Sequence, residues 1–192
     1  LPRAGIVHRL DKDTSGLMVV ARSLAAHTAL VRALRRRDVK RIYWALVEGV
    51  MTGGTTVDAP VGRHPQARTR MTVREDGRTA LTHLRVKERF RAHSLAEATL
   101  ETGRTHQIRV HLNYLGYPVV GDRNYGFRGR LPRGAGESLR EGIREFSRQA
   151  LHAHELVLAH PVSGEAMHWT APLPQDMQAL LDVLREDAEV SN

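Results

Sequence analysis

Stretches of alternating apolar side chains in the middle of the chain are the feature that most constrains the fold. Residues 41–48 are rich in β-branched and aromatic side chains and predict a strand. Its side chains would fall on two faces, Ile42, Trp44 and Leu46 on one and Tyr43, Ala45 and Val47 on the other. Residues 79–90 and 94–100 continue as strands after an Asp76-Gly77 turn signal, so we expect an antiparallel meander.

Helical patterns flank this meander. Ser23 is suited to cap a helix that would carry Leu24, Val31 and Leu34 inward. Residues 106–115 predict a second helix, closed by Gly116. A last amphipathic helix should open at Pro174, with four apolar side chains inward: Met177, Leu180, Leu181 and Leu184.

Shorter segments complete the pattern. Residues 17–21 form an apolar run that predicts a buried strand, and residues 151–159 and 166–171 predict a hairpin that turns at 161–164. Residues 127–149 are rich in Gly and Arg, which is typical of a mobile basic loop followed by a short helix. The pattern shows no internal repeat and no linker between domains.

Charge and composition narrow the class of protein. The 192 residues include 29 Lys and Arg against 21 acidic residues, a net charge of +8 that favours a polyanionic partner such as nucleic acid. The absence of cysteine excludes disulfides and thiol catalysis, and no apolar run is long enough to cross a bilayer. We expect a soluble, cytoplasmic protein. Because the first residue is Leu1, we also expect the chain to begin inside a longer protein.

Basic residues gather where the first helix should end. Arg32 and Arg35 to Arg37 are followed closely by Lys40 and Arg41. Cations at a helix C-terminus complement the helix dipole, but six are more than that role needs. We therefore expect this cluster to contact phosphate.

Three polar segments stand beside turns rather than on smooth faces. They are residues 8–16 (HRLDKDTSG), residues 41–45 (RIYWA) and residues 103–111 (GRTHQIRVH). Taken alone, the first is only a polar loop before a strand, although loops in such positions often hold catalytic groups.

Together, these segments resemble the RluA family of RNA pseudouridine synthases. The first resembles the family's HRLDxxTSG signature, the second its tyrosine motif and the third its GRTHQIRxH motif. The similarity continues through residues 116–122, 149–153 and 160–161. Residues 63–65, the Pro-Arg-Gly loop and residues 172–176 look most like the members that modify large-subunit ribosomal RNA.

The resemblance implies an α+β catalytic domain with a mixed, mainly antiparallel bent sheet, flanking helices and a central active-site cleft. The whole of residues 1–192 would belong to this domain. Related members commonly carry further strands and an S4-like RNA-binding domain upstream, which we expect to be absent from this sequence. The implied partner is RNA, either free ribosomal RNA or an assembling ribosomal particle. We expect a monomer that needs no cofactor.

The resemblance also implies three catalytic residues. Asp11 matches the family's catalytic carboxylate, a group that can act as nucleophile, as base or as stabiliser of positive charge on the sugar. Arg109 matches the basic residue that pairs with it, and a neighbouring cation favours the charged form of a carboxylate. Tyr43 matches the tyrosine expected to stack beneath the target uracil, whereas we expect Trp44 beside it to fill the core.

Three further residues are implied to contact RNA. Arg9 matches the position expected to insert where the flipped base has left the stack, which suits a planar guanidinium. Arg104 and His106 are expected to contact RNA or substrate.

Other interpretations of these residues remain. A catalytically silent RNA-binding module would explain the charge, and a glycosidase or nuclease would pair Asp11 with a second carboxylate. Asp13 is interpreted as turn-forming. The pairs His106 with His111 and His152 with His154 lack metal-ligand spacing and a carboxylate partner, so we expect no metal.

Overall fold

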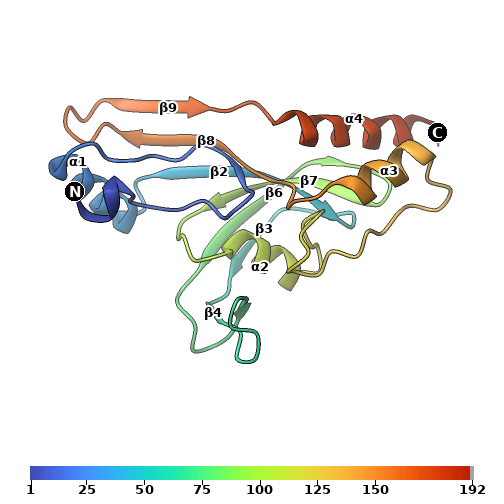
Figure 1. The fold of residues 1–192 in the computed structure, drawn as a ribbon, viewed down its shortest axis with the longest axis horizontal. Helices are drawn as coiled ribbons and strands as arrows, with labels where there is room; N and C mark the ends of the chain where they lie inside the picture. The colour runs from blue at the N-terminus through green and yellow to red at the C-terminus, as the bar shows by residue number, and fades with distance from the viewer. Residues whose placement is uncertain (191–192) are drawn as a thin grey trace.

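The computed structural model describes residues 1–190, and its centre is a seven-stranded sheet (Figure 1). The strands are β1 (Ser15–Gly16), β2 (Lys40–Glu48), β3 (Thr55–Asp58), β6 (Leu81–Arg89), β7 (His93–Leu100), β8 (Leu151–Ala159) and β9 (Ala166–Thr170). Their order is β1-β8-β2-β7-β6-β3, with β9 also paired to β8, and every pairing except the parallel β1–β8 contact is antiparallel. The expected α+β fold with a mainly antiparallel sheet is confirmed, as are the meander and the late hairpin.

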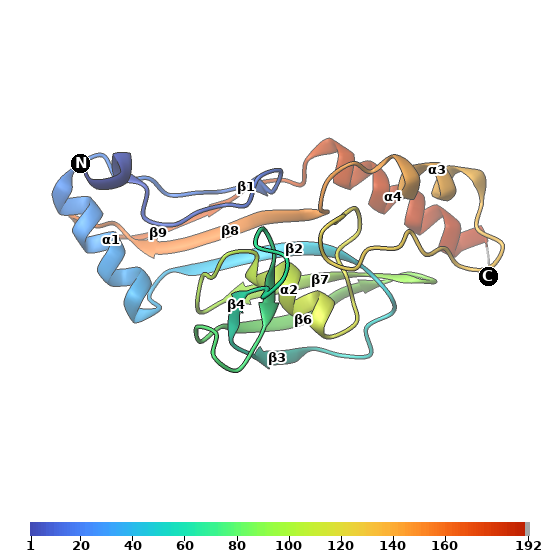
Figure 2. The ribbon, with the colours of Figure 1, turned by 60° about the horizontal axis from the view of Figure 1, so that its bottom comes forward.

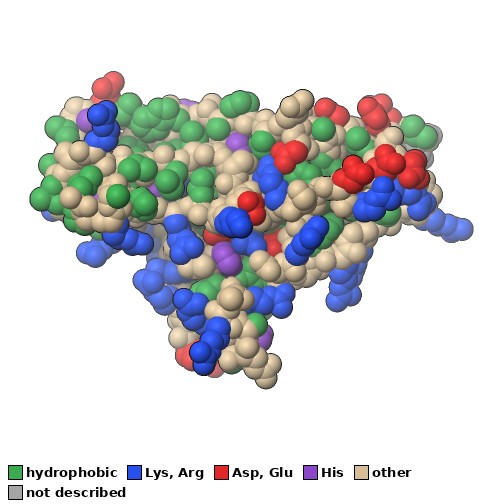
Figure 3. Space-filling model, in the orientation of Figure 1, with side chains coloured by type: hydrophobic (Ala, Val, Ile, Leu, Met, Phe, Trp, Pro, Cys, Tyr) green, Lys and Arg blue, Asp and Glu red, His purple; other side chains and the backbone are tan. Residues whose placement is uncertain are grey.

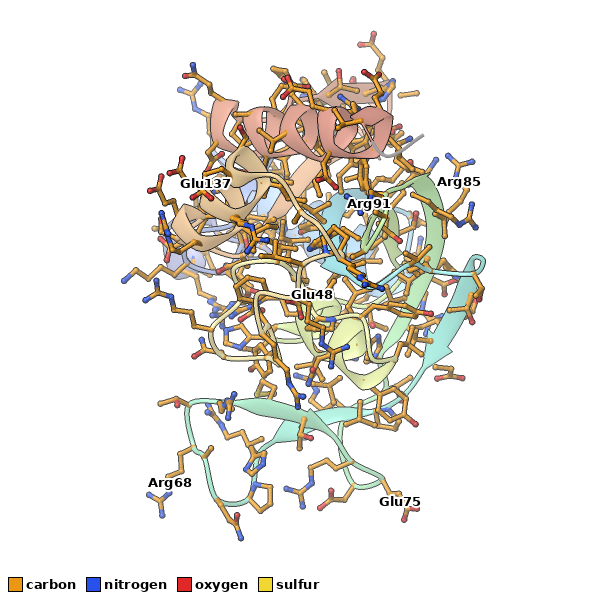
Figure 4. All side chains as sticks on the ribbon, turned by 90° about the vertical axis from the view of Figure 1, so that its right-hand side faces the viewer. Glu48, Arg68, Glu75, Arg85, Arg91 and Glu137 are labelled. Carbon is orange, nitrogen blue, oxygen red and sulfur yellow. The ribbon has the colours of Figure 1, made fainter. Side chains whose placement is uncertain are left out.

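A second, two-stranded sheet projects from the body of the molecule. It consists of β4 (Val61–Arg63) and β5 (Met71–Val73), and it forms the downward extension in Figure 1. In Figure 4 Arg68, in the loop that joins β4 and β5, and Glu75, in the turn after β5, point away from the body. The predicted Asp76-Gly77 turn is present, because the Gly77 N–H donates to the Arg74 carbonyl at 2.9 Å.

Four α-helices surround the main sheet, after a short 3-10 turn, η1 (Pro2–Gly5). They are α1 (Leu24–Arg36), α2 (Gln107–Tyr114), α3 (Glu137–Glu145) and α4 (Gln175–Val190). Ser23 caps α1 as predicted, since its hydroxyl accepts a hydrogen bond from the Ala26 N–H at 3.1 Å. The four apolar residues predicted to face inward from α4 are all buried. No helix of the described chain is long and apolar enough to cross a membrane.

The helices pack against separate parts of the core. The larger hydrophobic cluster joins the sheet to α2, α3 and α4, whereas a smaller one joins α1 to β8 through Ala26, Leu30 and Leu156. Figure 2 shows α1 and the N-terminal segment at one end of the molecule and α3 and α4 at the other, with α2 between them. The polar segments near α2 therefore lie at the middle of the fold.

Two local predictions were wrong, those for residues 17–21 and for part of the inward face of α1. Residues 17–21 form no buried strand: only Ser15 and Gly16 pair with β8, because β9 occupies the rest of that edge, and Met18 and Val20 are exposed. Helix α1 docks through Ala26 and Leu30, so Leu24 at its first turn is 62% exposed.

Leu34 of α1 packs against the smaller hydrophobic cluster, as predicted, although it is only partly buried. Val31 is also partly buried but lies outside that cluster. Trp44 packs against the larger hydrophobic cluster, in agreement with its prediction as a core residue, but it is not fully buried. Its ring is partly buried and stacks on His154 at 4.0 Å between centroids, and the Lys87 ammonium lies 4.7 Å from its ring centre.

Candidate active site

A buried arginine holds two carboxylates at the centre of the fold. Arg109 on α2 donates from Nε and Nη2 to the two oxygens of Asp122 at 2.7 and 3.0 Å, and from Nη1 to Asp11 Oδ2 at 3.3 Å. The side chains of Arg109 and Asp122 are 5% and 1% exposed, and that of Asp11 is 13% exposed. Burial alone would lower the pKa of Arg109, but the hydrogen bonds and charges of Asp122 and Asp11 raise it instead. Arg109 is thus a fixed cation that orients Asp11.

The chain reaches Asp122 through a tightly held segment. Backbone hydrogen bonds join Val120 to Leu46 of β2 and to Ala150, at 2.9 and 2.8 Å. Gly121 follows with φ +78°, and a Cβ there would lie 2.0 Å from the Arg148 carbonyl oxygen, so only glycine fits. This geometry delivers the Asp122 carboxylate to Arg109 with little freedom.

The loop that carries Asp11 is held from the opposite side. Asp13 adopts a left-handed conformation with φ +70°, and the Thr14 N–H donates to the Asp11 carbonyl at 3.1 Å, which makes a tight turn. Arg148 donates to the Asp13 carbonyl at 3.1 Å, and Gln149 donates to the Lys12 carbonyl at 2.6 Å. Asp13 therefore lies in a turn, in agreement with its interpretation from sequence, and two side chains outside the loop fix its shape.

Tyr43 lies on β2, beside an irregularity in the sheet. The register between β2 and β8 shifts between Ile42 and Tyr43, where β8 carries one extra residue. Such bulges re-aim neighbouring side chains and are common beside active sites. The Tyr43 side chain is buried, and burial raises its pKa to about 12, with the charge of Asp11 adding to the rise and that of Arg41 opposing it. The phenol is therefore neutral at physiological pH.

Asp11 and Tyr43 open into one cavity of about 740 Å³. Arg9, Arg104 and His106 line the same cavity, so the structure brings five of the six predicted site residues to its wall. Arg109, the sixth, lies behind Asp11 and reaches the cavity only through that carboxylate. Of the three predicted RNA contacts, Arg9 is exposed and the other two are partly buried.

His106 forms the wall of the cavity nearest the projecting hairpin. Its Nδ1 lies 2.6 Å from the Tyr125 hydroxyl, which also accepts a hydrogen bond from the Met71 N–H at 2.9 Å. The Arg109 guanidinium lies 4.9 Å from the Tyr125 ring centre. Burial lowers the pKa of His106, although the charge of Asp11 opposes the shift. Tyr125 thus links the hairpin, α2 and the arginine that holds Asp11.

Gln107 shapes the loop that precedes α2. Its side-chain oxygen accepts from Thr102 Oγ1 and the Arg104 N–H at 2.8 and 3.0 Å, and its amide donates to Thr82 Oγ1 at 2.9 Å. The Thr82 hydroxyl lies 2.8 Å from His111 Nδ1, and His111 Nε2 donates to the Ala59 carbonyl. Both ring nitrogens of His111 are therefore occupied.

The same is true of His152, whose two ring nitrogens contact the Ser15 hydroxyl and the Ala171 carbonyl. Across residues 1–190, no group of three or more His, Asp or Glu side chains is arranged to hold a metal ion.

The surface around the cavity is strongly basic. In Figure 3 Lys and Arg side chains gather along the lower side, where the body meets the projecting hairpin, whereas acidic side chains gather over α3 and α4. Seven arginines line the cavity against two carboxylates, Asp11 and Glu101. Glu101 is already paired with Arg37 and His83, both at 2.5 Å, so the net field favours an anionic ligand.

The predicted basic cluster is divided by the structure. Arg35 and Arg36 are exposed on the last turn of α1, and Arg37 pairs with Glu101. Arg41 is instead buried on β2. Among the site's residues, sequence reasoning gave no role to Asp122 or Gln107, although both fall in segments that resemble the family, and it did not separate Arg41 from the surface cations.

Comparison with known proteins gives a consistent result. Residues 1–114 match the family model described as RNA pseudouridylate synthase. The chain is 58% identical over 188 residues to the ribosomal large subunit pseudouridine synthase D of Xanthomonas campestris pv. campestris, covering 98% of this chain and 57% of that protein. It is 55% identical over 189 residues to the protein of the same name from Escherichia coli K12, covering 98% of this chain and 58% of that protein.

Solved structures agree. Human RNA Pseudouridylate Synthase Domain Containing 4 superposes with a TM-score of 0.77 at 27% identity, covering 94% of this chain and 75% of that one. Human RNA Pseudouridylate Synthase Domain Containing 1 gives a TM-score of 0.70 at 29% identity, with coverage of 93% and 79%. The chain spans 57% and 58% of the length of the two curated relatives above. The fold, the three motifs and these relatives together place the chain in the RNA pseudouridylate synthase family.

Proposed function

We propose that this chain is the catalytic domain of an enzyme that converts uridine to pseudouridine in RNA. The observation that carries the proposal is the placement of Asp11, which is held by the buried Arg109–Asp122 pair in the wall of a cavity that Tyr43 also lines. The proposed substrate is large-subunit ribosomal RNA, because the relatives at 55% and 58% identity are named ribosomal large subunit pseudouridine synthase D. Free RNA and an assembling ribosomal particle both fit this proposal, and both would place the protein in the cytoplasm.

The reaction breaks one bond to the ribose and forms another. The bond from uracil N1 to C1′ is cleaved, the base turns within the site, and a bond from C5 to C1′ replaces it. C5 loses a proton and N1 gains one, so the RNA keeps its composition. The Asp11 carboxylate suits this sequence as nucleophile, as base or as stabiliser of positive charge at C1′. Each role requires the ionised carboxylate, and the Arg109 guanidinium contacts and orients that carboxylate at 3.3 Å.

Tyr43 supplies the floor for the base in this proposal. Its ring lines the cavity beside Asp11, and an aromatic face can stack on a uracil whatever the orientation of that base. Because the pKa of Tyr43 is raised to about 12, its hydroxyl is a hydrogen-bond donor and not a free base at physiological pH. It could then assist removal of the C5 proton only by passing its own proton on at the same time.

A uridine in a folded RNA reaches this cavity only if it leaves its stack. Flipping costs a few kcal/mol, which contacts to the vacated position can offset. Arg9 is exposed at the cavity and carries a planar guanidinium that can stack on bases and bond phosphate together. Arg104 and His106 line the same cavity and supply further contacts to RNA in this proposal.

The alternatives fit the site less well. A glycosidase or nuclease needs a second free carboxylate beside Asp11, but both oxygens of Asp122 accept hydrogen bonds from Arg109. A silent RNA-binding module has no need for a buried cation that orients a carboxylate towards a cavity.

Nucleoside analysis of treated RNA tests the proposal. Large-subunit ribosomal RNA lacking modifications is incubated with the protein, digested to nucleosides and separated, while the mass of the undigested RNA is measured. We expect pseudouridine to appear in an amount equal to the uridine lost, with no change in RNA mass. Loss of uracil from the RNA would indicate a glycosidase, chain cleavage would indicate a nuclease, and binding without any conversion would indicate the silent module.

A further inference from the structure

Arg41 is a buried cation that lacks a partner. It is 7% exposed, and within residues 1–190 its guanidinium makes no hydrogen bond or ion pair, while its Nε is fully enclosed. A guanidinium cannot lose its proton in a protein, so its charge remains when water is removed. Burial of an unpaired charge destabilises a fold, and buried arginines are therefore normally paired with an anion. The described chain provides none for Arg41.

The position of Arg41 connects it to the site. It precedes Tyr43 by two residues on β2, so the two side chains leave the same face of the strand, and both line the cavity that holds Asp11. The guanidinium lies against Gly103, where an added Cβ would stand 2.7 Å from Nη1. The guanidinium therefore lies beside the loop that precedes α2.

His8 adds a second donor beside Arg41. The Val19 N–H donates to His8 Nε2 at 3.0 Å, so the neutral ring must carry its proton on Nδ1. Burial, and next the charge of Arg41, lower the pKa of His8 to about 4, which keeps the ring neutral at physiological pH. Its Nδ1 is enclosed and has no partner in the described chain. Since both groups only donate, neither can satisfy the other.

The two carboxylates that line the cavity are unavailable to Arg41. Asp11 pairs with Arg109, and Glu101 pairs with Arg37. An acceptor for Arg41 must therefore enter with a ligand. A uracil carbonyl could accept one hydrogen bond, but it would leave the buried charge without a counter-charge. A phosphate matches both the charge and the forked shape of a guanidinium.

We propose that Arg41 binds the phosphate on one side of the uridine that enters the cavity. This inference rests on the proposed function. The contact would require a phosphate at a fixed distance from the base that stacks on the Tyr43 ring. It would therefore favour a uridine within an RNA chain over free uridine and would hold the backbone still while the base turns.

RNA with single neutral linkages tests the contact. A synthetic hairpin contains one uridine that the wild-type protein converts, with the natural backbone or with an uncharged methylphosphonate on the 5′ or the 3′ side of that uridine. With wild-type protein, we expect one of the two methylphosphonates to lower kcat/KM by about 10- to 100-fold, the range for a hydrogen bond to a charged group. This comparison requires no substitution in the protein.

Substitution then assigns the loss to Arg41. Arg41→Gln should lower kcat/KM on the natural hairpin by a similar factor. In this variant, the methylphosphonate that lowers wild-type activity should lower kcat/KM by less than about a further 3-fold, because the two changes remove the same contact. The matched control is Arg85→Gln, also an arginine in a strand, which points outward from β6 and is 72% exposed at its side chain (Figure 4). It should respond to the methylphosphonates as wild type does.

Thermal unfolding separates a ligand contact from a structural role. Because Arg41 is unpaired in the free protein, Arg41→Gln should leave the melting temperature unchanged or raise it. A clear fall in the melting temperature would indicate a structural role and overturn the proposal. The proposal would also be overturned if the losses in kcat/KM from Arg41→Gln and from the methylphosphonate multiplied, or if neither methylphosphonate lowered kcat/KM of the wild-type protein. If wild type converts no uridine in any natural RNA, the proposed function fails and the phosphate contact fails with it.

Discussion

Replacing Asp122 with asparagine should destabilise the protein strongly, whereas the same change at Asp11 should not. Asp122 accepts two hydrogen bonds from Arg109 at 2.7 and 3.0 Å, and both side chains are almost fully buried. Removing one partner of a buried ion pair typically costs about 3–5 kcal/mol. Asparagine keeps one acceptor and Asp11 keeps its charge, so we expect a loss of roughly 2–4 kcal/mol in the free energy of unfolding.

Asp11 offers the matched comparison. It makes a single, longer contact of 3.3 Å to Arg109, and its side chain is partly open to the cavity. In Asp11→Asn the guanidinium stays paired with Asp122, so no buried charge is left alone and the loss should be below about 1 kcal/mol. Urea denaturation of both variants, monitored by circular dichroism, gives the two free energies of unfolding directly. Equal losses in the free energy of unfolding, or a smaller loss for Asp122→Asn, would refute the assignment of Asp122 as the structural partner of Arg109 and of Asp11 as the reactive carboxylate.

Other properties follow from the same geometry. The pKa of His8 falls from 6.5 to about 4 on folding, so the unfolded chain binds more protons than the folded one between those pH values. The contribution of His8 to the free energy of unfolding is therefore complete above pH 6.5 and should fall by roughly 2 kcal/mol at pH 5. In urea titrations at both pH values, His8→Gln should lose this dependence, and a slope equal to that of wild type would contradict the assignment. Replacing arginines 35–37 with glutamine should weaken RNA binding and reduce its salt dependence by about one unit of slope per lost phosphate contact. An unchanged slope would mean that these residues face solvent only. Tyr43→Phe should keep RNA affinity within a few-fold, whereas Tyr43→Ala should lose about 1–3 kcal/mol of stacking in binding assays; equal affinities would exclude a stacked base.

The sequence predicted those elements whose signals are local. The Ser23 cap depends on one hydroxyl and one backbone N–H three residues later, and the inward face of α4 follows from helical spacing alone. By contrast, the fate of residues 17–21 depended on β9, which lies about 150 residues away and takes the edge that the apolar run would need. Competition between distant strands leaves no trace in a short window of sequence.

The site shows the same limit. The motifs indicated Asp11, Tyr43 and Arg109, but the carboxylate that anchors Arg109 comes from a loop pinned to β2, and its role depends on contacts made only in the fold. Likewise, Arg41 belongs to a run of basic residues in the sequence, and nothing in the run distinguishes it from its neighbours. Only the alternation of β2 turns it inward, towards the cavity, while Arg35 stays exposed.

The most direct test of the central claim is the release of tritium from RNA labelled at uracil C5. Large-subunit ribosomal RNA is treated with the wild-type protein and with Asp11→Asn, and RNA affinity is measured on the same preparations. C5 loses its hydrogen only if a new bond forms there. The account predicts release by wild type, none by Asp11→Asn, and affinities within a few-fold of each other. Tight binding without release by wild type, or release that persists in Asp11→Asn, would contradict it.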